Sequence, residues 1–290
     1  MTIPMRYLIT GKHGQLARTF ARRFEAKGIE YSAPDESILD ITDSAAVRSI
    51  IAAYRPDIVL NCAAYNLVDK AEQERSRAAE INAIAPGTLA IAAREQGARI
   101  VHFGSDYVFD GAKENGLYTE VDATNPLNEY GKCKLAGEDA VLREHDRPLV
   151  LRLSWVYGEG QQNFIHKLRA WAAGNEFLKI ACDEFSVPTW TDTVVDITIQ
   201  ALDQGLSGRY HLTNSGYCSR YEWASLALRA MGIAKFIRPV PMDVFQLPAK
   251  RPRFSAMSNE RIAALVGVDI PAWDDAVKAF IKQGGENNGL

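Results

Sequence analysis

The sequence places a tyrosine and a lysine at a spacing that could transfer a proton. Tyr130 and Lys134 stand four residues apart in the run Tyr-Gly-Lys-Cys-Lys, so a helix would present both side chains on one face. A free phenol has a pKa of about 10, and a nearby ammonium lowers it by favouring the phenolate. The pair therefore predicts an acid and the group that tunes it, although roughly one such pair arises by chance in every two chains of this composition.

A hydroxyl group completes this candidate set. Ser105 follows Gly104 and the apolar run 99–103, where a strand of a parallel sheet would end. Ligands bind at the carboxyl edge of such sheets, and a serine hydroxyl there can donate a hydrogen bond to a carbonyl oxygen. The alternative for Ser105 is a turn serine. The order Ser105, Tyr130, Lys134 resembles that of the extended short-chain dehydrogenases/reductases.

A glycine turn near the N-terminus predicts a dinucleotide site. The run Gly-Lys-His-Gly-Gln-Leu-Ala at 11–17 lies between an apolar strand at 7–10 and a helical pattern at 15–26. Small residues at this position let a pyrophosphate approach exposed backbone N–H groups. The GxxGxxA pattern alone is weak, but its place between the first strand and the first helix strengthens it. The cofactor contacts expected here are Gly11, His13, Gly14, Gln15 and Leu16.

The residues after the second extended run bear on the choice of cofactor. Asp35, with Asp40 close behind it, could accept hydrogen bonds from the adenosine ribose and disfavour a 2′-phosphate. No arginine follows this run, and the nearest basic candidates are Lys12 and the pair Arg22-Arg23. The sequence therefore favours NADH or the use of both cofactors. The alternative for Asp35 is a turn former.

The elements that must position these residues alternate along the first half of the chain. Apolar runs at 7–10, 28–33, 57–61, 99–103 and 148–153 alternate with helical patterns at 15–26, 44–54, 76–96 and 129–143. This alternation predicts a doubly wound parallel α/β sheet of the Rossmann type. Shorter elements follow, with helices at 164–173, 192–203, 220–231, 259–266 and 273–282 and strands at 177–181 and 210–212. We expect a dinucleotide-binding domain at 1–153, completed by a helix and a strand within 190–213, and a smaller, mainly substrate-binding α/β domain at 154–290.

The composition excludes several other classes of protein. The 290 residues are 47% hydrophobic and 24% charged, as in an ordinary globular protein with a sizeable core. With 33 Lys+Arg against 36 Asp+Glu, the net charge of -3 gives no surplus of positive charge for a nucleic acid. Four dispersed cysteines predict neither a disulfide framework nor a zinc site. Without a signal peptide or an apolar stretch of about 18 residues, we expect a cytoplasmic protein with no membrane partner.

Longer motifs resemble one family along nearly the whole chain. They are Asn61-Cys-Ala-Ala-Tyr-Asn-Leu-Val-Asp-Lys-Ala-Glu72, Gly104-Ser-Asp-Tyr-Val-Phe-Asp-Gly111, Pro126-Leu-Asn-Glu-Tyr-Gly-Lys-Cys-Lys-Leu-Ala-Gly-Glu138, Arg152-Leu-Ser-Trp-Val-Tyr-Gly158, Asn163-Phe164, Val187-Pro-Thr189 and Arg251-Pro252. In their residues and order, they resemble those of the dTDP-4-dehydrorhamnose reductases. The VDKAE and SDYVFDG segments distinguish this family from most other extended reductases.

The resemblance implies an activity and a set of site residues. It implies that NADPH or NADH reduces the C4 ketone of dTDP-6-deoxy-L-lyxo-4-hexulose to dTDP-L-rhamnose. Ser105 would hydrogen-bond the ketone oxygen, Tyr130 would protonate it, and Lys134 would hold the nicotinamide ribose. Further implied cofactor contacts are Asp35, Asp40, Ile41, Cys62, Ala63, Ala64, Tyr65 and Asn82. Further implied contacts to the dTDP-sugar are Val68, Asp106, Tyr107, Trp155, Asn163 and Arg251.

Some positions depart from the family pattern. Asn66 and Leu67 replace the usual Thr-Ala, so the sequence does not determine the shape of the sugar pocket. Ser186 replaces a glycine before the Val-Pro-Thr segment. In some bacterial members an acid in the first helix helps to bind an interfacial magnesium ion. Thr19 stands at that position here, so we expect no metal site.

Two other functions compete with this interpretation. A nucleotide-sugar epimerase or dehydratase could share the fold, but such dehydratases need an Asp-Glu pair where this chain has Asp106-Tyr107. A non-catalytic NAD(P)-binding subunit is the second alternative, because the regulatory subunit of methionine adenosyltransferase resembles these reductases. The intact set of Ser105, Tyr130 and Lys134 favours catalysis. The cofactor preference, the exact sugar and the oligomeric state, with a homodimer as one possibility, stay open.

Overall fold

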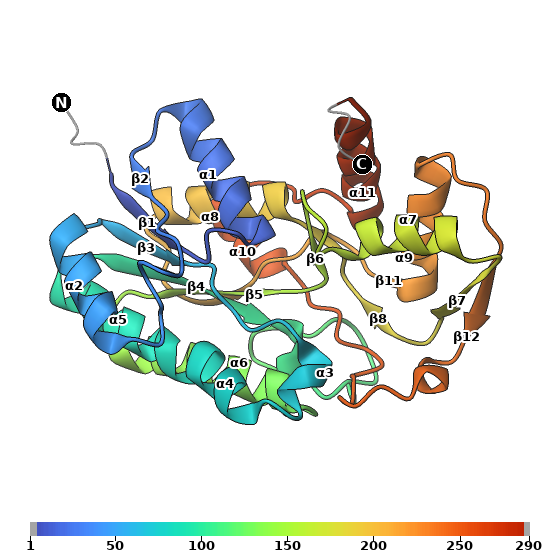
Figure 1. Cartoon of the computed structure of the whole chain (residues 1–290), viewed down its shortest axis with the longest axis horizontal. Helices are drawn as coiled ribbons and strands as arrows, with labels where there is room; N and C mark the ends of the chain where they lie inside the picture. The colour runs from blue at the N-terminus through green and yellow to red at the C-terminus, as the bar shows by residue number, and fades with distance from the viewer. Residues whose placement is uncertain (1–4, 287–290) are drawn as a thin grey trace.

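A six-stranded parallel sheet lies in the left-hand half of the molecule in Figure 1, as the alternating pattern predicts. The structure is a computed structural model, and it describes residues 5–286. In the sheet the strands follow the order β10-β5-β4-β3-β1-β2, and every neighbouring pair is parallel. The strands are β1 (Tyr7–Thr10), β2 (Tyr31–Ser32), β3 (Ile58–Asn61), β4 (Arg99–Ser105), β5 (Leu149–Leu153) and β10 (Gly208–His211).

Helices cover both faces of this sheet (Figure 1). On one face lie α1 (Gln15–Lys27), α8 (Thr191–Asp203) and α10 (Glu260–Val266); on the other lie α2 (Ser44–Tyr54), α5 (Ala85–Glu95) and α6 (Glu129–Glu144). Alternate residues of one strand enter different cores, since Ile9 packs with the α1 layer and Leu8 with the α2 layer. A strand buried on both sides therefore reads as a continuous apolar run.

The ends of the sheet helices are specified locally. Asp43 caps α2 by accepting hydrogen bonds from the backbone N of Ala45 and Ala46, which satisfies two otherwise free donors. Asn128 caps α6 in the same way through the backbone N of Gly131, at 2.8 Å. These caps fix where α2 and α6 begin, and α6 carries two of the predicted site residues.

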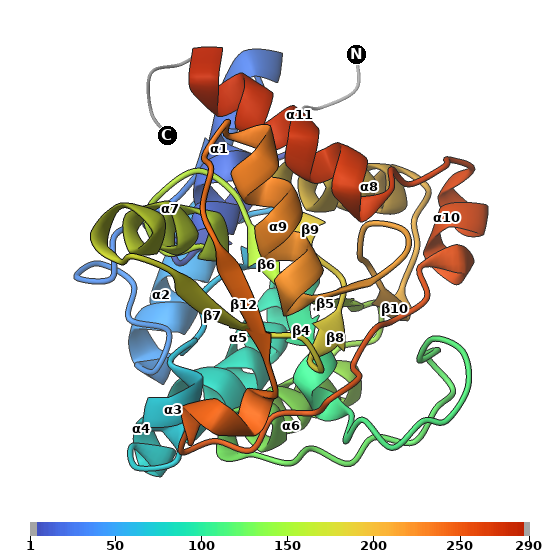
Figure 2. The ribbon, with the colours of Figure 1, turned by 90° about the vertical axis from the view of Figure 1, so that its right-hand side faces the viewer.

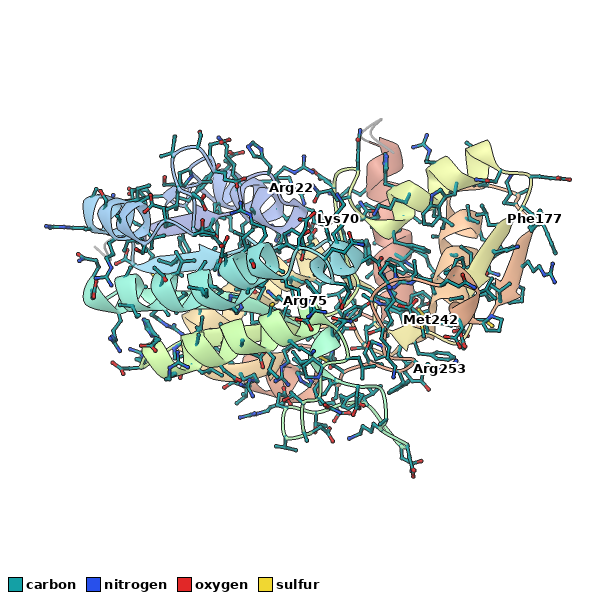
Figure 3. The ribbon with its side chains drawn as sticks, turned by 60° about the horizontal axis from the view of Figure 1, so that its bottom comes forward. Arg22, Lys70, Arg75, Phe177, Met242 and Arg253 are labelled. Carbon is teal, nitrogen blue, oxygen red and sulfur yellow. The ribbon has the colours of Figure 1, made fainter. Side chains whose placement is uncertain are left out.

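The C-terminal lobe is built from helices and short strand pairs (Figure 2). Its helices are α7 (Phe164–Gly174), α9 (Arg220–Ala230) and α11 (Trp273–Glu286); its strand pairs are β6 (Val156–Tyr157) with β9 (Thr189–Trp190), β7 (Leu178–Ala181) with β12 (Ile237–Val240), and β8 (Phe185–Ser186) with β11 (Cys218–Ser219). Its core centres on the buried ring of Trp223, against which Tyr157 packs. Phe177 lies at the outer end of this lobe, away from the sheet (Figure 3).

Several parts of the fold differ from the sequence-based expectation. The helix expected at 76–96 consists of α4 (Arg75–Ala79), a π-helical segment η1 (Glu80–Ile84) and α5. The short helices α3 (Val68–Ala71), η2 (Asp106–Val108) and η3 (Met242–Phe245) were not expected, nor were the strands β6, β8, β9, β11 and β12. Helices of three or four residues are too short to show a periodic pattern. The π-helical segment could not be predicted either, because a π-helix and an α-helix do not differ in amino-acid composition.

Two features, a membrane-spanning helix and a cluster of metal-binding side chains, are absent from residues 5–286. In that part of the chain no helix is both long enough and apolar enough to span a membrane. It likewise contains no group of three or more His, Cys, Asp or Glu side chains arranged around a metal position. Thr19 is buried against α8, where its hydroxyl donates to the Thr191 hydroxyl at 3.0 Å.

Candidate active site

The glycine turn lies where the strand order reverses, between β1 and β3. Gly11 follows β1 with a φ of +70°, and a Cβ atom there would lie 2.7 Å from the backbone N of Ala63. Only glycine permits this approach of the two loops. Gly14 then begins α1 without a side-chain cap, so the first-turn N–H groups face the crevice as anion-binding donors. This cradle fits the pyrophosphate of a dinucleotide.

Two adjoining cavities occupy this edge of the sheet. The glycine-turn cavity, of about 310 Å³, lies between residues 11–14 and the loop after β2. The Tyr130 cavity, of about 320 Å³, lies beside the ends of β4 and β5 and the start of α6. Both cavities are lined by Gly14, Cys62, Ala64, Asn66 and Gln162. Because they share a wall, one extended ligand could occupy both.

The three predicted catalytic side chains all line the Tyr130 cavity. Ser105 ends β4, and Tyr130 and Lys134 lie in the first two turns of α6. A Cβ atom on Gly131 would collide with the backbone O of Tyr107, so glycine lets α6 pack directly against the turn after β4. The sequence therefore brings the phenol, the ammonium and the hydroxyl to one cavity, as their spacing and setting predict.

Burial controls the acidity of this set. Burial raises the pKa of Tyr130 to about 12; the Ser105 hydroxyl opposes that rise and the Asp106 carboxylate adds to it. Burial lowers the pKa of Lys134 to about 8, although Glu138, one turn further along α6, opposes this change. Lys134 Nζ donates to the backbone O of Phe103 at 2.6 Å. The Tyr130 pKa shifts upward, opposite to the lowering that the Tyr130/Lys134 spacing predicts, because burial dominates.

A buried carboxylate surrounded by serines lies directly behind Ser105. Asp106 Oδ2 accepts hydrogen bonds from Ser255 at 2.6 Å, Ser186 at 2.9 Å and Ser154 at 3.1 Å. Asp106 Oδ1 accepts one from Ser105 at 3.3 Å. All five residues are buried, and burial raises the pKa of Asp106 while the hydroxyls lower it. This serine cage connects the end of β4 to the C-terminal lobe.

Other residues predicted to contact the sugar also lie on the Tyr130 cavity wall, namely Val68, Asp106, Tyr107 and Trp155. Trp155 has a left-handed backbone, with a φ of 38°, which is strained for a bulky residue. The Arg220 guanidinium lies 3.6 Å from the centre of the Trp155 ring. The Trp223 ring stacks on the Trp155 ring, with 5.5 Å between the ring centres. These contacts hold the indole at the cavity in spite of the strain.

Two predicted substrate residues lie away from that wall. Asn163 is buried at the start of α7, where its amide donates to the backbone O of Gly158 at 2.6 Å and of Gly160 at 2.8 Å. Arg251 pairs with Asp69 of α3 at 2.7 Å and lines a different cavity. That cavity also includes Met242 and Arg253, which lie close together in Figure 3. Asn163 and Arg251 thus hold loops around the site, and their contact with substrate stays a prediction.

Most of the predicted cofactor residues line one of the two cavities. In the glycine-turn cavity are Gly11, His13, Gly14, Asp40, Ile41, Cys62, Ala63 and Ala64, while Gln15 and Leu16 line the Tyr130 cavity. Asp35, Tyr65 and Asn82 line neither cavity. Asp35 Oδ2 lies 2.6 Å from His13 Nε2, and the Asn82 amide hydrogen-bonds both the backbone N and O of Tyr65. Asn82 therefore holds the loop after β3 in place without lining either cavity.

Several lining residues were not among the predicted contacts, although Asn66 was expected to bear on the shape of the sugar pocket. Asn66 Oδ1 accepts a hydrogen bond from the Tyr130 hydroxyl at 3.4 Å, and its place in the family motif was the available signal. Arg77, in α4, and Gln162, in the loop before α7, also line the glycine-turn cavity. Neither belongs to a local pattern, because tertiary folding alone brings them to the crevice.

Known proteins are similar to this chain along nearly its whole length. The family model described as "RmlD substrate binding domain" matches residues 5–285. The chain is 37% identical over 276 residues to the dTDP-4-dehydrorhamnose reductase of Mycolicibacterium smegmatis, covering 94% of this chain and 84% of that protein. It is 34% identical over 277 residues to a "probable dTDP-4,6-dihydroxy-2-methyloxan-3-one 4-ketoreductase" of Streptomyces antibioticus, covering 94% of each.

A solved structure extends this agreement to the whole fold. The dTDP-4-dehydrorhamnose reductase of Bacillus anthracis, in complex with NADP, superposes with a TM-score of 0.93 at 31% identity, covering 97% of this chain and 100% of that chain. A family match of this length, together with relatives above 30% identity, establishes the relationship. The chain therefore belongs to the dTDP-4-dehydrorhamnose reductases, NAD(P)H-dependent oxidoreductases of the extended short-chain dehydrogenase/reductase superfamily.

Proposed function

We propose that this chain reduces the C4 ketone of dTDP-6-deoxy-L-lyxo-4-hexulose to dTDP-L-rhamnose, with NADPH or NADH as the reductant. The observation that carries the proposal is that Ser105, Tyr130 and Lys134 line one cavity, which adjoins the glycine-turn cavity. A nicotinamide cofactor supplies a hydride when it is bound. The protein must then hold the ketone, donate a proton to its oxygen and exclude competing water.

Tyr130 is the proposed proton donor. Its pKa of about 12 keeps the phenol protonated at neutral pH, so the proton is in place before the carbonyl oxygen gains negative charge. The Ser105 hydroxyl turns from Asp106 Oδ1 to the ketone oxygen; that starting hydrogen bond is long, at 3.3 Å, and is easily given up. Asp106 keeps its three other serine donors during this change.

Lys134 is proposed to hold the nicotinamide ribose. With a pKa of about 8 it is mostly an ammonium at neutral pH. One of its three N–H groups is directed to the Phe103 carbonyl, which leaves two donors for ribose hydroxyls. Its positive charge also favours the phenolate that Tyr130 becomes after donating its proton.

The remaining proposed contacts divide between the two ligands. Cofactor contacts are proposed at Gly11, His13, Gly14, Gln15, Leu16, Asp40, Ile41, Cys62, Ala63 and Ala64, and sugar contacts at Val68, Asp106, Tyr107 and Trp155. Asp106 can meet a sugar hydroxyl only through Oδ1, because three serines already surround Oδ2. Trp155 offers an apolar face for the deoxy sugar.

The test is turnover of the purified chain with the authentic dTDP-4-keto sugar. We expect NADPH or NADH consumption, followed at 340 nm, and a product that matches dTDP-L-rhamnose by NMR. Tight cofactor binding without turnover would contradict the proposal and favour a non-catalytic binding subunit. A matched assay with Ser105→Ala separates enzyme turnover from background oxidation of the cofactor.

A related 4-keto-6-deoxy sugar is the second candidate substrate. The observation that favours it is the pair Asn66 and Leu67: Asn66 contacts the Tyr130 hydroxyl, and Leu67, the next residue in the chain, is 53% exposed. A relative at 34% identity carries the name of a different dTDP-sugar 4-ketoreductase. Comparing kcat/KM for the two sugar nucleotides decides between these substrates, and a higher value for the second would overturn the rhamnose assignment.

A further inference from the structure

The glycine-turn cavity contains an arginine from a distant part of the chain. Arg77 of α4 lines this cavity together with Glu36 and Asp40 from the loop after β2. An acid at the end of the second strand of such folds meets the adenosine ribose, so this is the end of the cavity that an adenosine would occupy. Arg77 therefore lies where the 2′-hydroxyl or the 2′-phosphate of the adenosine ribose would bind.

The two arginines considered from the sequence already have carboxylate partners. Arg22 pairs with Asp192 of α8 at 2.6 Å, and Arg23 pairs with Asp196 of the same helix. Neither arginine lines the glycine-turn cavity. His13, which does, is 2.6 Å from Asp35. Arg77 and Lys12 are thus the arginine and the lysine that line this cavity.

The present partners of Arg77 hold it loosely. Its guanidinium lies 3.6 Å from Glu36 Oε1 and 3.8 Å from Glu80 Oε2, both beyond normal hydrogen-bond distance. The Glu36 side chain is 76% exposed and that of Arg77 43% exposed, so water and salt screen the pairing. The guanidinium can therefore turn to a stronger anion without losing a firm contact.

We infer that Arg77 binds the 2′-phosphate of NADPH and gives this chain a preference for NADPH over NADH. The planar guanidinium matches a phosphate through two parallel N–H···O bonds, which a ribose hydroxyl cannot provide. Asp40, on the same wall, accepts from the Thr42 backbone N at 2.9 Å and can still receive a ribose hydroxyl of NADH. NADH is accepted through Asp40, and with NADPH the Arg77 contact outweighs the repulsion between the Asp40 carboxylate and the 2′-phosphate. The inference deepens the proposed function and rests on it only for the use of a nicotinamide cofactor.

The experiment measures the binding of NADPH and NADH to the full-length chain without sugar, by cofactor fluorescence titration. We expect Arg77→Gln to weaken NADPH binding by about 10-fold, which corresponds to about 1.4 kcal/mol, and to change NADH binding by less than about twofold. Arg75→Gln is the matched control. Arg75 lies in the same short helix (labelled in Figure 3), is exposed, donates to the Glu72 carbonyl and does not line the cavity.

Two more readouts distinguish a phosphate contact from a general loss of positive charge. Glu36→Gln should strengthen NADPH binding about twofold, because it removes a competing carboxylate. Raising the salt concentration should weaken NADPH binding more than NADH binding in the wild type, and this difference should shrink in Arg77→Gln. Equal losses for both cofactors in Arg77→Gln, or an equal effect of Arg75→Gln, would overturn the inference. The binding titration contains no sugar, so its result does not depend on whether the chain turns over the proposed substrate.

Discussion

The two ends of the crevice are built in different ways. At the Tyr130 cavity the polar groups are buried: Lys134 and Asp106 are each 3% exposed, and both hydrogen-bond to buried neighbours. At the adenosine end the charged groups are more exposed, and Arg77 pairs only loosely with Glu36. Buried hydrogen bonds are strong and expensive to break, whereas exposed ion pairs contribute little.

This difference separates two functions of one site. The buried end fixes the geometry on which the chemical step depends. The exposed end can change its choice of cofactor without disturbing the core, because single substitutions there break few firm contacts. We therefore expect substitutions at the Tyr130 cavity to alter kcat or stability, and substitutions at the adenosine end to alter cofactor affinity alone.

The largest expected effect is at the proposed acid. Tyr130→Phe removes the proton donor while keeping the ring, and should lower kcat by at least about 100-fold. Cofactor affinity should stay within about twofold, because the glycine turn is untouched. Steady-state kinetics and cofactor titration check both quantities. If Tyr130→Phe lowered cofactor affinity as much as it lowers kcat, the two ends of the crevice would not have separate functions.

The serine cage gives the next largest effect. Ser255→Ala removes the hydroxyl 2.6 Å from the buried Asp106 carboxylate and should lower the free energy of unfolding by about 1–3 kcal/mol. Ser37→Ala is the matched change at the exposed end, where Ser37 lies 3.3 Å from Asp35, and should leave unfolding unchanged. Urea denaturation measures both. Equal stabilities for the two variants would show that burial does not distinguish these carboxylates.

The pH dependence should follow Lys134. Its pKa of about 8 means that the ammonium is present below that pH and is lost as the pH rises through it. We expect kcat/KM to fall up to tenfold per pH unit above about pH 8, since the phenol of Tyr130 stays protonated up to a pKa of about 12. A rate profile measured between about pH 6 and pH 10 tests this. A profile that is flat above pH 9 would contradict it.

The smallest effects distinguish two acids at the exposed end. Asp40 lines the glycine-turn cavity, whereas Asp35 lies outside that wall and close to His13. Asp40→Asn should weaken NADH binding by about threefold to tenfold, and Asp35→Asn by less than about twofold. Titration with NADH measures both variants. A larger effect of Asp35→Asn would restore the assignment that sequence position alone suggests.

Local patterns were sufficient to predict much of the architecture. The apolar runs became β1, β3, β4 and β5, because strands buried on both faces are built mainly from apolar residues. The four-residue spacing of Tyr130 and Lys134 was informative because an α-helix converts it into one shared face.

Features that depend on distant segments could not be predicted. The hydroxyls around Asp106 come from residues 105, 154, 186 and 255, and nothing in any one segment indicates that they meet. Arg77 could not be predicted for the same reason, because only the folded chain brings α4 beside the loop after β2. The rise in the Tyr130 pKa was also missed, since burial is a property of the packed cavity.

The most direct test of the account follows the hydride. Wild-type enzyme is incubated with the dTDP-4-keto sugar and NADPH carrying deuterium at the transferable position of nicotinamide C4, and the product is examined by NMR and mass spectrometry. We predict one deuterium at C4 of the sugar, with transfer at least about 100-fold slower in Tyr130→Phe. A product that lacks the label, or equal transfer in the variant, would contradict ketone reduction with Tyr130 as the acid.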